Sequence, residues 1–282
     1  MRAASALPGL KDNRGSMPST TAPATAAEYD RFADIYGVWT DTAASTRANL
    51  PFYVDEYLAA EGPVVELGVG DGRIAVEAAA LGCRLIGIDV SEAMLRLCRA
   101  RAEARGVADR LALLAGDFRT FSLDRPAGLI ALPYHSLGHL VTPAAKRDAL
   151  SRVYAQLRPG GRFVFDDFLM TAALKAHMRQ VQLRAAYRGE DGAERLLWVT
   201  SLLDDAAQTM TVVTWEDALD ADGVLARRQY RRLSLSWLDP EQARGLLVAA
   251  GFAIEACYGD FARTPFDPAT AHEQVWIARR PA

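Results

Sequence analysis

Short apolar segments alternate with longer amphipathic segments over residues 63–168 of this 282-residue chain. Continuous apolar segments are typical of strands that are buried on both faces, whereas apolar residues three or four positions apart indicate helices. The expected strands cover residues 63–67, 85–89, 111–115, 128–132 and 162–168. The expected helices between them cover residues 74–81, 91–105 and 143–157. This alternation of strands and helices predicts a parallel α/β sheet.

Residues 169–237 follow another pattern, in which apolar and polar residues alternate. A period of two residues predicts strands with one buried face. Such strands are expected over residues 175–188, 195–203, 209–217 and 225–237, with turns rich in Gly and Asp between them. We therefore expect an inserted antiparallel β subdomain that covers the substrate mouth or forms a subunit interface. A helix ending at residue 250 and two strands, over residues 253–258 and 274–278, then complete the main sheet.

The chain before the first strand has two parts. Residues 1–26 are rich in Ala, Ser, Thr and Pro without periodicity, which predicts a disordered N-terminal tail in which either Met1 or Met17 is the natural start. Residues 27–58 have a helical pattern instead, and one apolar-aromatic face consists of Tyr29, Phe32, Ala33 and Tyr36. Gly37 and Trp39 are expected to end the first of two helices.

Composition and charge exclude several classes of protein. The net charge is -3 and acidic and basic residues are interspersed, so the electrostatic signature of nucleic-acid binding is missing. No apolar run approaches the ~20 residues that span a bilayer. The three cysteines lie far apart among core-like residues, which predicts buried free thiols in a reducing compartment. We expect a soluble cytoplasmic protein that binds neither nucleic acid nor membrane.

A glycine-rich turn joins the first predicted strand to the first predicted helix. Gly68, Gly70 and Gly72 stand at alternate positions, where the chain must turn sharply and let a ligand approach its backbone. The second strand ends in Asp89, at the place where a carboxylate can hold both ribose hydroxyls of an adenosine. This arrangement of strand, turn, helix and acid predicts a nucleotide-binding unit.

The charge of this turn favours one class of ligand. Arg73 occupies the place of the third glycine in the dinucleotide fingerprint, and the carboxylates of Glu66 and Asp71 would repel a pyrophosphate. The same carboxylates suit a ligand that carries an ammonium and a sulfonium, as S-adenosylmethionine does. A purely structural glycine turn, or a dinucleotide site of another sort, is the alternative.

The sequence Glu-Leu-Gly-Val-Gly-Asp-Gly over residues 66–72 resembles motif I of the class I S-adenosylmethionine-dependent methyltransferases. The resemblance covers residues 27–280 and implies a Rossmann-like sheet of seven strands in the order 3-2-1-4-5-7-6, with the last strand antiparallel. It also implies a methyltransferase domain formed by residues 27–168 and 238–282, interrupted by the inserted β subdomain. S-adenosylmethionine is then the cofactor and S-adenosylhomocysteine its product.

The same resemblance implies further contacts with the cofactor, besides those of the glycine turn and Asp89. They involve Arg47 for the cofactor carboxylate, Val90 and Met94 for the adenine ring, Asp117 for the adenine amino group, Phe118 for stacking, and Leu132 at the end of the fourth strand. The alternatives are an exposed helix arginine for Arg47 and simple core packing for Val90 and Met94. An acid at the carboxyl end of a strand is where a doubly wound sheet binds its ligands.

The loop after the fourth strand, Pro-Tyr-His-Ser-Leu-Gly-His-Leu over residues 133–140, resembles that of small-molecule N-methyltransferases, including those acting on amino sugars. It lacks the polar first residue of the Asn/Asp-Pro-Pro-Tyr motif of nucleic-acid enzymes. His139, or else His135, is expected to act as a general base or a substrate hydrogen-bonding group, with capping or packing as the alternative. Tyr36 is a further catalytic candidate, and the candidates for substrate binding are Trp39, Tyr134 and Asp167.

A metal site is not expected. The two histidines of this loop lack a third ligand, and the adjacent Asp166 and Asp167 point to opposite faces of their strand. A metal-dependent O-methyltransferase is therefore disfavoured.

The predicted function is methyl transfer from S-adenosylmethionine to a small molecule, most simply to a nitrogen atom. The whole chain resembles N-methyltransferases of bacterial secondary metabolism, including the toxoflavin-type enzymes that methylate azapteridines. Three alternatives remain open: a small-molecule O-methyltransferase, a non-catalytic cofactor-binding protein and a nicotinamide-dependent reductase. A homo-oligomer through the inserted β subdomain is a further expectation.

Overall fold

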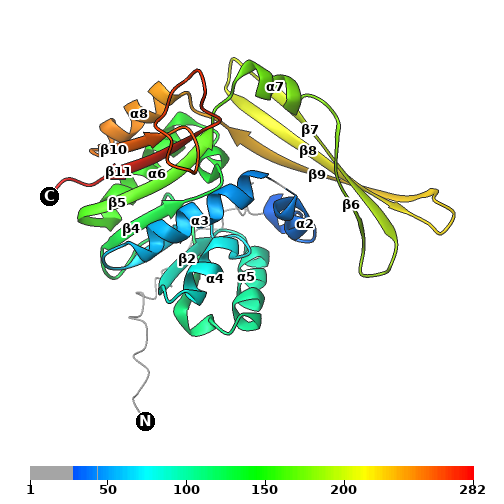
Figure 1. The fold of residues 1–282 in the computed structure, drawn as a ribbon, viewed down its shortest axis with the longest axis horizontal. Coiled ribbons are helices and arrows are strands. Elements are labelled where there is room, and N and C mark those ends of the chain that lie inside the picture. The colour runs from blue at the N-terminus through cyan, green and yellow to red at the C-terminus, as the bar shows by residue number, and fades with distance from the viewer. Residues whose placement is uncertain (1–27, 43) are drawn as a thin grey trace, which may run out of the picture.

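The computed structural model describes residues 28–42 and 44–282, and seven of its strands form one mixed sheet in the order β3-β2-β1-β4-β5-β11-β10 (Figure 1). The strands are β1 (Val64–Leu67), β2 (Leu85–Asp89), β3 (Leu111–Ala115), β4 (Ala127–Leu132), β5 (Leu157–Phe168), β10 (Ala253–Tyr258) and β11 (Glu273–Arg279). The first five are parallel, whereas β11 is antiparallel to both of its neighbours. The predicted order 3-2-1-4-5-7-6 is confirmed, with β10 and β11 as its sixth and seventh strands.

Helices cover both faces of this sheet, as its continuous apolar strands require. One face is covered by α3 (Ala44–Leu58), α4 (Arg73–Ala80) and α5 (Glu92–Ala104), and the other by α6 (Pro143–Gln156) and α8 (Pro240–Ala249). The fully buried strand β1 shows how the two layers divide. Val64 packs in the first core cluster and the adjacent Val65 in the second, because neighbouring strand residues point to opposite faces.

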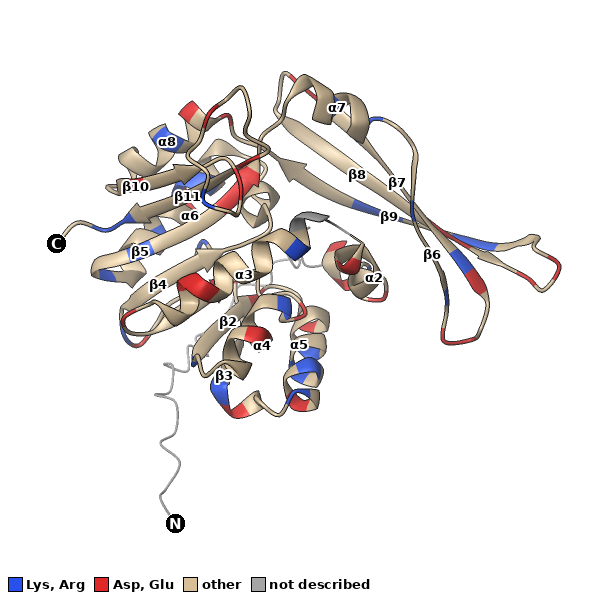
Figure 2. Cartoon of the chain, viewed as in Figure 1, with Lys and Arg blue, Asp and Glu red and all other residues tan. Residues whose placement is uncertain are grey.

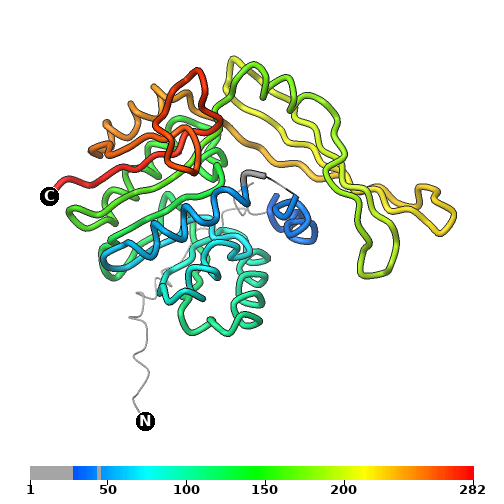
Figure 3. The backbone as a smooth tube through the Cα atoms, in the orientation of Figure 1, coloured from blue at the N-terminus to red at the C-terminus, as the bar shows by residue number. Residues whose placement is uncertain are grey.

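The carboxyl half of the chain carries a second sheet of four antiparallel strands in the order β6-β7-β8-β9. They are β6 (Gln182–Arg188), β7 (Glu194–Asp204), β8 (Thr209–Leu219) and β9 (Leu225–Ser236). In Figure 3 its long hairpins extend away from the main sheet. The inserted antiparallel sheet is therefore confirmed, whereas its role as a lid or an interface stays a prediction.

Two boundaries differ from those predicted. Residues 175–178 belong to helix α7 (Ala172–Met178) and not to a strand, because the Thr171 hydroxyl accepts a hydrogen bond from Leu174 N–H and starts a helix there. Strand β5 begins before residue 162, since Leu157 already pairs with Ala127 of β4.

The N-terminal segment, residues 28–42, also differs from expectation. Gly37 and Trp39 do not end a helix but lie within α2 (Tyr36–Asp41), because Trp39 N–H donates to the Ile35 carbonyl and carries the helical turn through the glycine. Phe32 and Ile35 are fully buried against β8 and β9, so this segment joins the second sheet to the main domain. The predicted disordered tail, residues 1–26, lies outside the described residues.

Charges of both signs are interspersed along the helices and hairpins (Figure 2). Within the described residues, no helix is long and apolar enough to cross a bilayer. Cys83 and Cys98 are buried, Cys257 is half-buried, and all three are free thiols as predicted.

Candidate active site

The glycine turn lies at the carboxyl end of β1 and leads into α4. Gly70 has a φ of 56°, and a Cβ there would stand 3.4 Å from the Tyr36 hydroxyl. Gly72 precedes α4 with a φ of 80°, and a Cβ there would approach Cys98 Sγ of α5 to 2.4 Å. Larger residues would therefore be strained at both positions, and the turn needs glycine.

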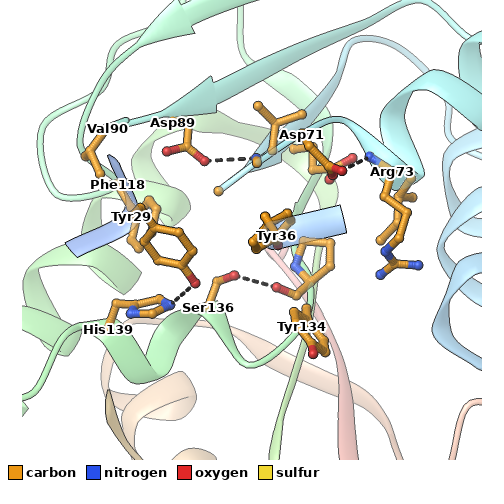
Figure 4. Close-up of a pocket in the computed structure, with 16 residues that line it drawn as sticks. Tyr29, Tyr36, Asp71, Arg73, Asp89, Val90, Phe118, Tyr134, Ser136 and His139 are labelled. Atoms are coloured by element: carbon orange, nitrogen blue, oxygen red, sulfur yellow. Dashed lines mark hydrogen bonds between the residues drawn. The ribbon is translucent and has the colours of Figure 1, made fainter. Parts of the chain in front are cut away.

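A small cavity of about 50 Å³, here called the loop cavity, opens beside this turn (Figure 4). Its acidic lining residues are Glu66, Asp71 and Asp89, one from each part of the predicted nucleotide-binding unit. The two Asp89 oxygens accept N–H groups of Gly70 and Ser91, each at 2.9 Å, which fixes this carboxylate at the end of β2.

Glu66 is the carboxylate with unused binding capacity. Its side chain is buried, and its Oε2 atom has no hydrogen-bond partner among the described residues. Burial raises the pKa of Glu66 to about 8, although Tyr57 and Arg73 favour the ionised form. A buried, unsatisfied carboxyl group is costly in isolation and suits a cationic ligand that would share its charge.

A second cavity of about 440 Å³ lies between the main domain and the four-stranded sheet, and is here called the intersheet cavity. Its walls include Trp39 of α2, Phe168 at the end of β5 and Arg184 of β6. This volume falls within the ~300–1,000 Å³ that is usual for small-molecule sites.

Three residues line both cavities: Tyr29, Tyr134 and His139. We call them the shared wall. In Figure 4 the Tyr29 and His139 side chains point toward each other, and 2.8 Å separates the Tyr29 hydroxyl from His139 Nε2. The two cavities therefore adjoin at these three side chains.

The loop after β4 holds two residues, Tyr134 and His135, in a strained backbone conformation. Tyr134 and His135 have φ angles of 59° and 57°, which are uncommon for residues other than glycine. The fully buried Asp166 of β5 holds them there, because it accepts Tyr134 N–H at 2.8 Å and His135 N–H at 2.9 Å. The Tyr53 hydroxyl of α3 donates a third hydrogen bond, at 2.5 Å, to the same carboxylate.

The two loop histidines have opposite electrostatic environments. Burial lowers the pKa of His139 to about 4, with the nearby Lys146 acting in the same direction. Burial would also lower the pKa of His135, but the Glu273 carboxylate at 2.9 Å, together with Asp166, raises it to about 9. At neutral pH His139 is therefore neutral and His135 is a cation paired with Glu273.

The structure brings together a large part of the predicted site. Predicted residues that line the loop cavity are Tyr36, Glu66, Gly68, Gly70, Asp89, Val90, Phe118, Tyr134 and His139. Predicted residues that line the intersheet cavity are Trp39, Tyr134, His135 and His139. Their individual roles stay predictions.

Other predicted residues lie outside both linings. Arg47 is exposed and donates to the Asp41 carbonyl at 3.1 Å, so Arg73 is the arginine that reaches the loop cavity. Asp117 is paired with Arg119, whose hydrogen bonds keep its pKa low although partial burial opposes this. Gly72, Met94, Leu132 and Asp167 are packed without lining either cavity.

The Asp167 carboxylate forms hydrogen bonds with backbone N–H groups. Its side chain is fully buried, and its oxygens accept the N–H groups of Phe168 at 2.8 Å and Leu238 at 3.2 Å. Burial raises the pKa of Asp167 to about 6. The structure thus places this carboxylate at the junction of β5 with the end of the inserted sheet.

Several lining residues are not among those predicted from the sequence. Tyr29 had a signal, since it belongs to the predicted aromatic face, and Arg73 directly follows the glycine turn. Arg184 and Glu273 had none, because only the pairing of distant strands brings them to the intersheet cavity. Among the residues that the structure describes, no three His, Cys, Asp or Glu side chains are grouped so as to hold a metal ion.

The chain is similar to known methyltransferases over this region. Residues 64–161 match the family model described as a methyltransferase domain. A protein of Geobacillus sp. (strain WCH70) that is named as a putative methyltransferase is 31% identical over 225 residues, which are 77% of this chain and 83% of that protein. The chain spans about half the length of other curated relatives. Its match to the carboxy-S-adenosyl-L-methionine synthase of Wolinella succinogenes, for example, covers 54% of that protein.

Solved structures extend the similarity to the inserted sheet. The CcbJ methyltransferase from Streptomyces caelestis is 26% identical with a TM-score of 0.73, and the match covers 92% of this chain and 99% of that one. The glycopeptide N-methyltransferase MtfA in complex with S-adenosyl-L-methionine is 25% identical with a TM-score of 0.52, covering 83% and 93%. The nicotinamide-dependent alternative is therefore wrong, and this chain belongs to the class I S-adenosylmethionine-dependent methyltransferases.

Proposed function

We propose that this protein transfers the methyl group of S-adenosylmethionine to a nitrogen atom of a small molecule that binds in the intersheet cavity. The observation that carries this proposal is the shared wall. It borders both a cavity with the acidic glycine turn and a larger cavity with mixed apolar and polar walls. Methyl transfer needs two ligands side by side with their reacting atoms aligned.

The residues of the loop cavity fit the cofactor. Asp89 stands at the strand end where ribose hydroxyls are bound, and the unsatisfied Glu66 oxygen suits the amino group of the methionyl part. Arg73 also lines the loop cavity, but its guanidinium donates to the Thr46 carbonyl at 2.6 Å and to Asn49 Oδ1 at 2.8 Å, so it would have to exchange one of these partners to bind the cofactor carboxylate. The cofactor supplies an electrophilic methyl group on its sulfonium. The loop cavity is narrow because Tyr36 packs over Gly70, so we expect this side chain to shift when cofactor binds.

Nitrogen is favoured over oxygen by the electrostatics of the loop histidines. An alcohol or phenol must lose its proton to attack, which requires a general base with a pKa near the working pH. His139, with a pKa of about 4, is a weak base, and His135 is already protonated and paired. A neutral amine or ring nitrogen needs only alignment. The similarity to the glycopeptide N-methyltransferase supports the same choice.

The walls of the intersheet cavity suit a ring system. Phe168 and Trp39 line this cavity with aromatic rings, against which another ring can pack by its face or edge. A heteroaromatic acceptor of secondary metabolism, such as an azapteridine, has a ring system of this kind. The sequence predicts that His139 is either a general base or a hydrogen-bonding group for the substrate, and we expect the second role. The Tyr29 hydroxyl would then hold the imidazole ring in its orientation.

The test is transfer of a labelled methyl group from S-adenosylmethionine to a panel of small amines, heteroaromatic nitrogen compounds and phenols. We expect label in the nitrogen compounds. Label in phenols alone would favour the O-methyltransferase. Tight binding of S-adenosylhomocysteine without transfer to any acceptor in the panel would favour a non-catalytic cofactor-binding protein.

A further inference from the structure

Arg184 is the cation of the intersheet cavity without an ionic partner. It lies on β6 and lines the cavity, and the described residues include no carboxylate within ion-pair distance of its guanidinium. Within residues 28–42 and 44–282, it donates one hydrogen bond, to the Trp39 carbonyl at 3.2 Å, and its buried Nε atom has no partner. Arg184 is half-buried, and this partial burial lowers its pKa from the ordinary value because the charge is held partly away from water.

The acid that lines the same cavity is already engaged. Glu273 accepts a hydrogen bond from His135 at 2.9 Å, and these two charges offset each other. Arg184 therefore leaves the cavity with an excess positive charge. Charges held partly away from water are normally paired, and an incomplete set of guanidinium hydrogen bonds favours an oxyanion, such as a carboxylate or a phosphate, that accepts two of them.

The position of Arg184 ties this charge to the shared wall. Its guanidinium lies over the Trp39 ring, 4.8 Å from the ring centre, which restrains its orientation. Burial raises the pKa of Tyr134 and the positive charge of Arg184 opposes that rise, so the two groups are electrostatic neighbours. An anion bound by Arg184 would thus lie close to the side chains that separate the two cavities.

We propose that Arg184 binds a carboxylate or phosphate on the methyl acceptor, so that the acceptor is a nitrogen compound that also carries an acidic group. This inference rests on the proposed function, because it assigns the acceptor to the intersheet cavity. The anion positions the nitrogen where the two cavities adjoin, and neutral amines of the same size bind less well.

The experiment measures binding without methyl transfer. Benzoate, phenyl phosphate and the neutral isostere benzamide are titrated calorimetrically into the full-length protein saturated with S-adenosylhomocysteine. We expect benzoate or phenyl phosphate to bind at least tenfold more tightly than benzamide, and the stronger of the two identifies the anion. Arg184→Gln should remove roughly ten- to a hundredfold of anion affinity and leave benzamide unchanged. Arg184→Lys should keep part of the preference, as a point charge without the planar fork.

A matched control lies on the opposite face of the same sheet. Arg232 is exposed on β9, and Arg232→Gln makes the same charge change outside the cavity. It should leave all three affinities unchanged. Equal affinity for benzoate, phenyl phosphate and benzamide, no detectable anion binding, or an anion preference that survives Arg184→Gln would each overturn the inference. If Arg184→Gln lowered the affinities for the anions and for benzamide equally, Arg184 would only hold the Trp39 ring in position. None of these outcomes depends on whether methyl transfer occurs.

Discussion

Replacing Asp166 by Asn should loosen the loop that carries the shared wall. The carboxylate accepts three hydrogen bonds, from Tyr53, Tyr134 and His135, and is fully buried. An asparagine keeps one acceptor oxygen but turns an NH₂ group toward at least one donor. One hydrogen bond to a charged group is then lost and the others become neutral, which costs about 2–4 kcal/mol of unfolding free energy.

Function should suffer more than folding. The positive φ angles of Tyr134 and His135 each store about 1–3 kcal/mol of strain. Without the hydrogen bonds to the Asp166 carboxylate, here called the clamp, the loop relaxes toward ordinary backbone conformations. A displacement of about 1 Å at a reacting group lowers the transfer rate by about a hundredfold. Three measurements test this: urea unfolding, hydrogen exchange of the Tyr134 and His135 amides, and single-turnover transfer to the acceptor found in the labelling screen.

The adjacent Asp167 provides the matched control. It is equally buried in β5, but its carboxylate binds Phe168 and Leu238 and leaves the loop untouched. Asp167→Asn should lose stability and keep amide protection in the loop and a transfer rate within a few fold of wild type. An Asp166→Asn protein with wild-type exchange and rate, or equal rate losses in both variants, would refute the clamp.

Three further outcomes follow from the buried titratable groups. Because the pKa of His139 is about 4, His139→Gln should keep the shape of the wild-type single-turnover profile from pH 5 to 9, and an inflection near 6.5 in wild type alone would contradict this. Because the pKa of Glu66 is about 8, this carboxyl group is mostly protonated at pH 7, and cofactor binding should release about one proton from it. Calorimetry in two buffers measures this proton release, which should be lost in Glu66→Gln. A wild type without proton release would rule out that contact. Since the pKa of His135 is raised from 6.5 to about 9, its contribution of order 3 kcal/mol is complete below pH 6.5 and disappears as the pH rises through 9. Urea unfolding should show this decline in wild type and not in Glu273→Gln, and equal slopes in both would exclude the pair as its source.

The main sheet could be predicted from local patterns in the sequence. The continuous apolar strands, the glycine turn and the acid at residue 89 depend on neighbours in the sequence, and the structure has them where they were expected, apart from the earlier start of β5. The helix expected over residues 91–105 is a further example, since α5 begins directly after Ser91, whose hydroxyl accepts Met94 N–H at 3.2 Å.

Long-range pairing explains what sequence analysis missed. Glu273 meets His135 because β11 returns antiparallel beside β5, and the sequence separation of 138 residues leaves no local signal. The clamp by Asp166 is of the same kind: the residue was considered as a metal ligand, although its oxygens are occupied by loop donors. The predicted homo-oligomer stays a prediction, because one chain does not test it.

The N-terminal segment has a consequence for the order in which ligands bind. Tyr29 and Tyr36 close the loop cavity, and Trp39 of the same segment closes the intersheet cavity. One movement of residues 28–42 would therefore open both sites, and an acceptor seated against Trp39 would hold the segment shut over the cofactor. Product-inhibition kinetics should then show a compulsory sequence, with S-adenosylmethionine entering first and S-adenosylhomocysteine leaving last.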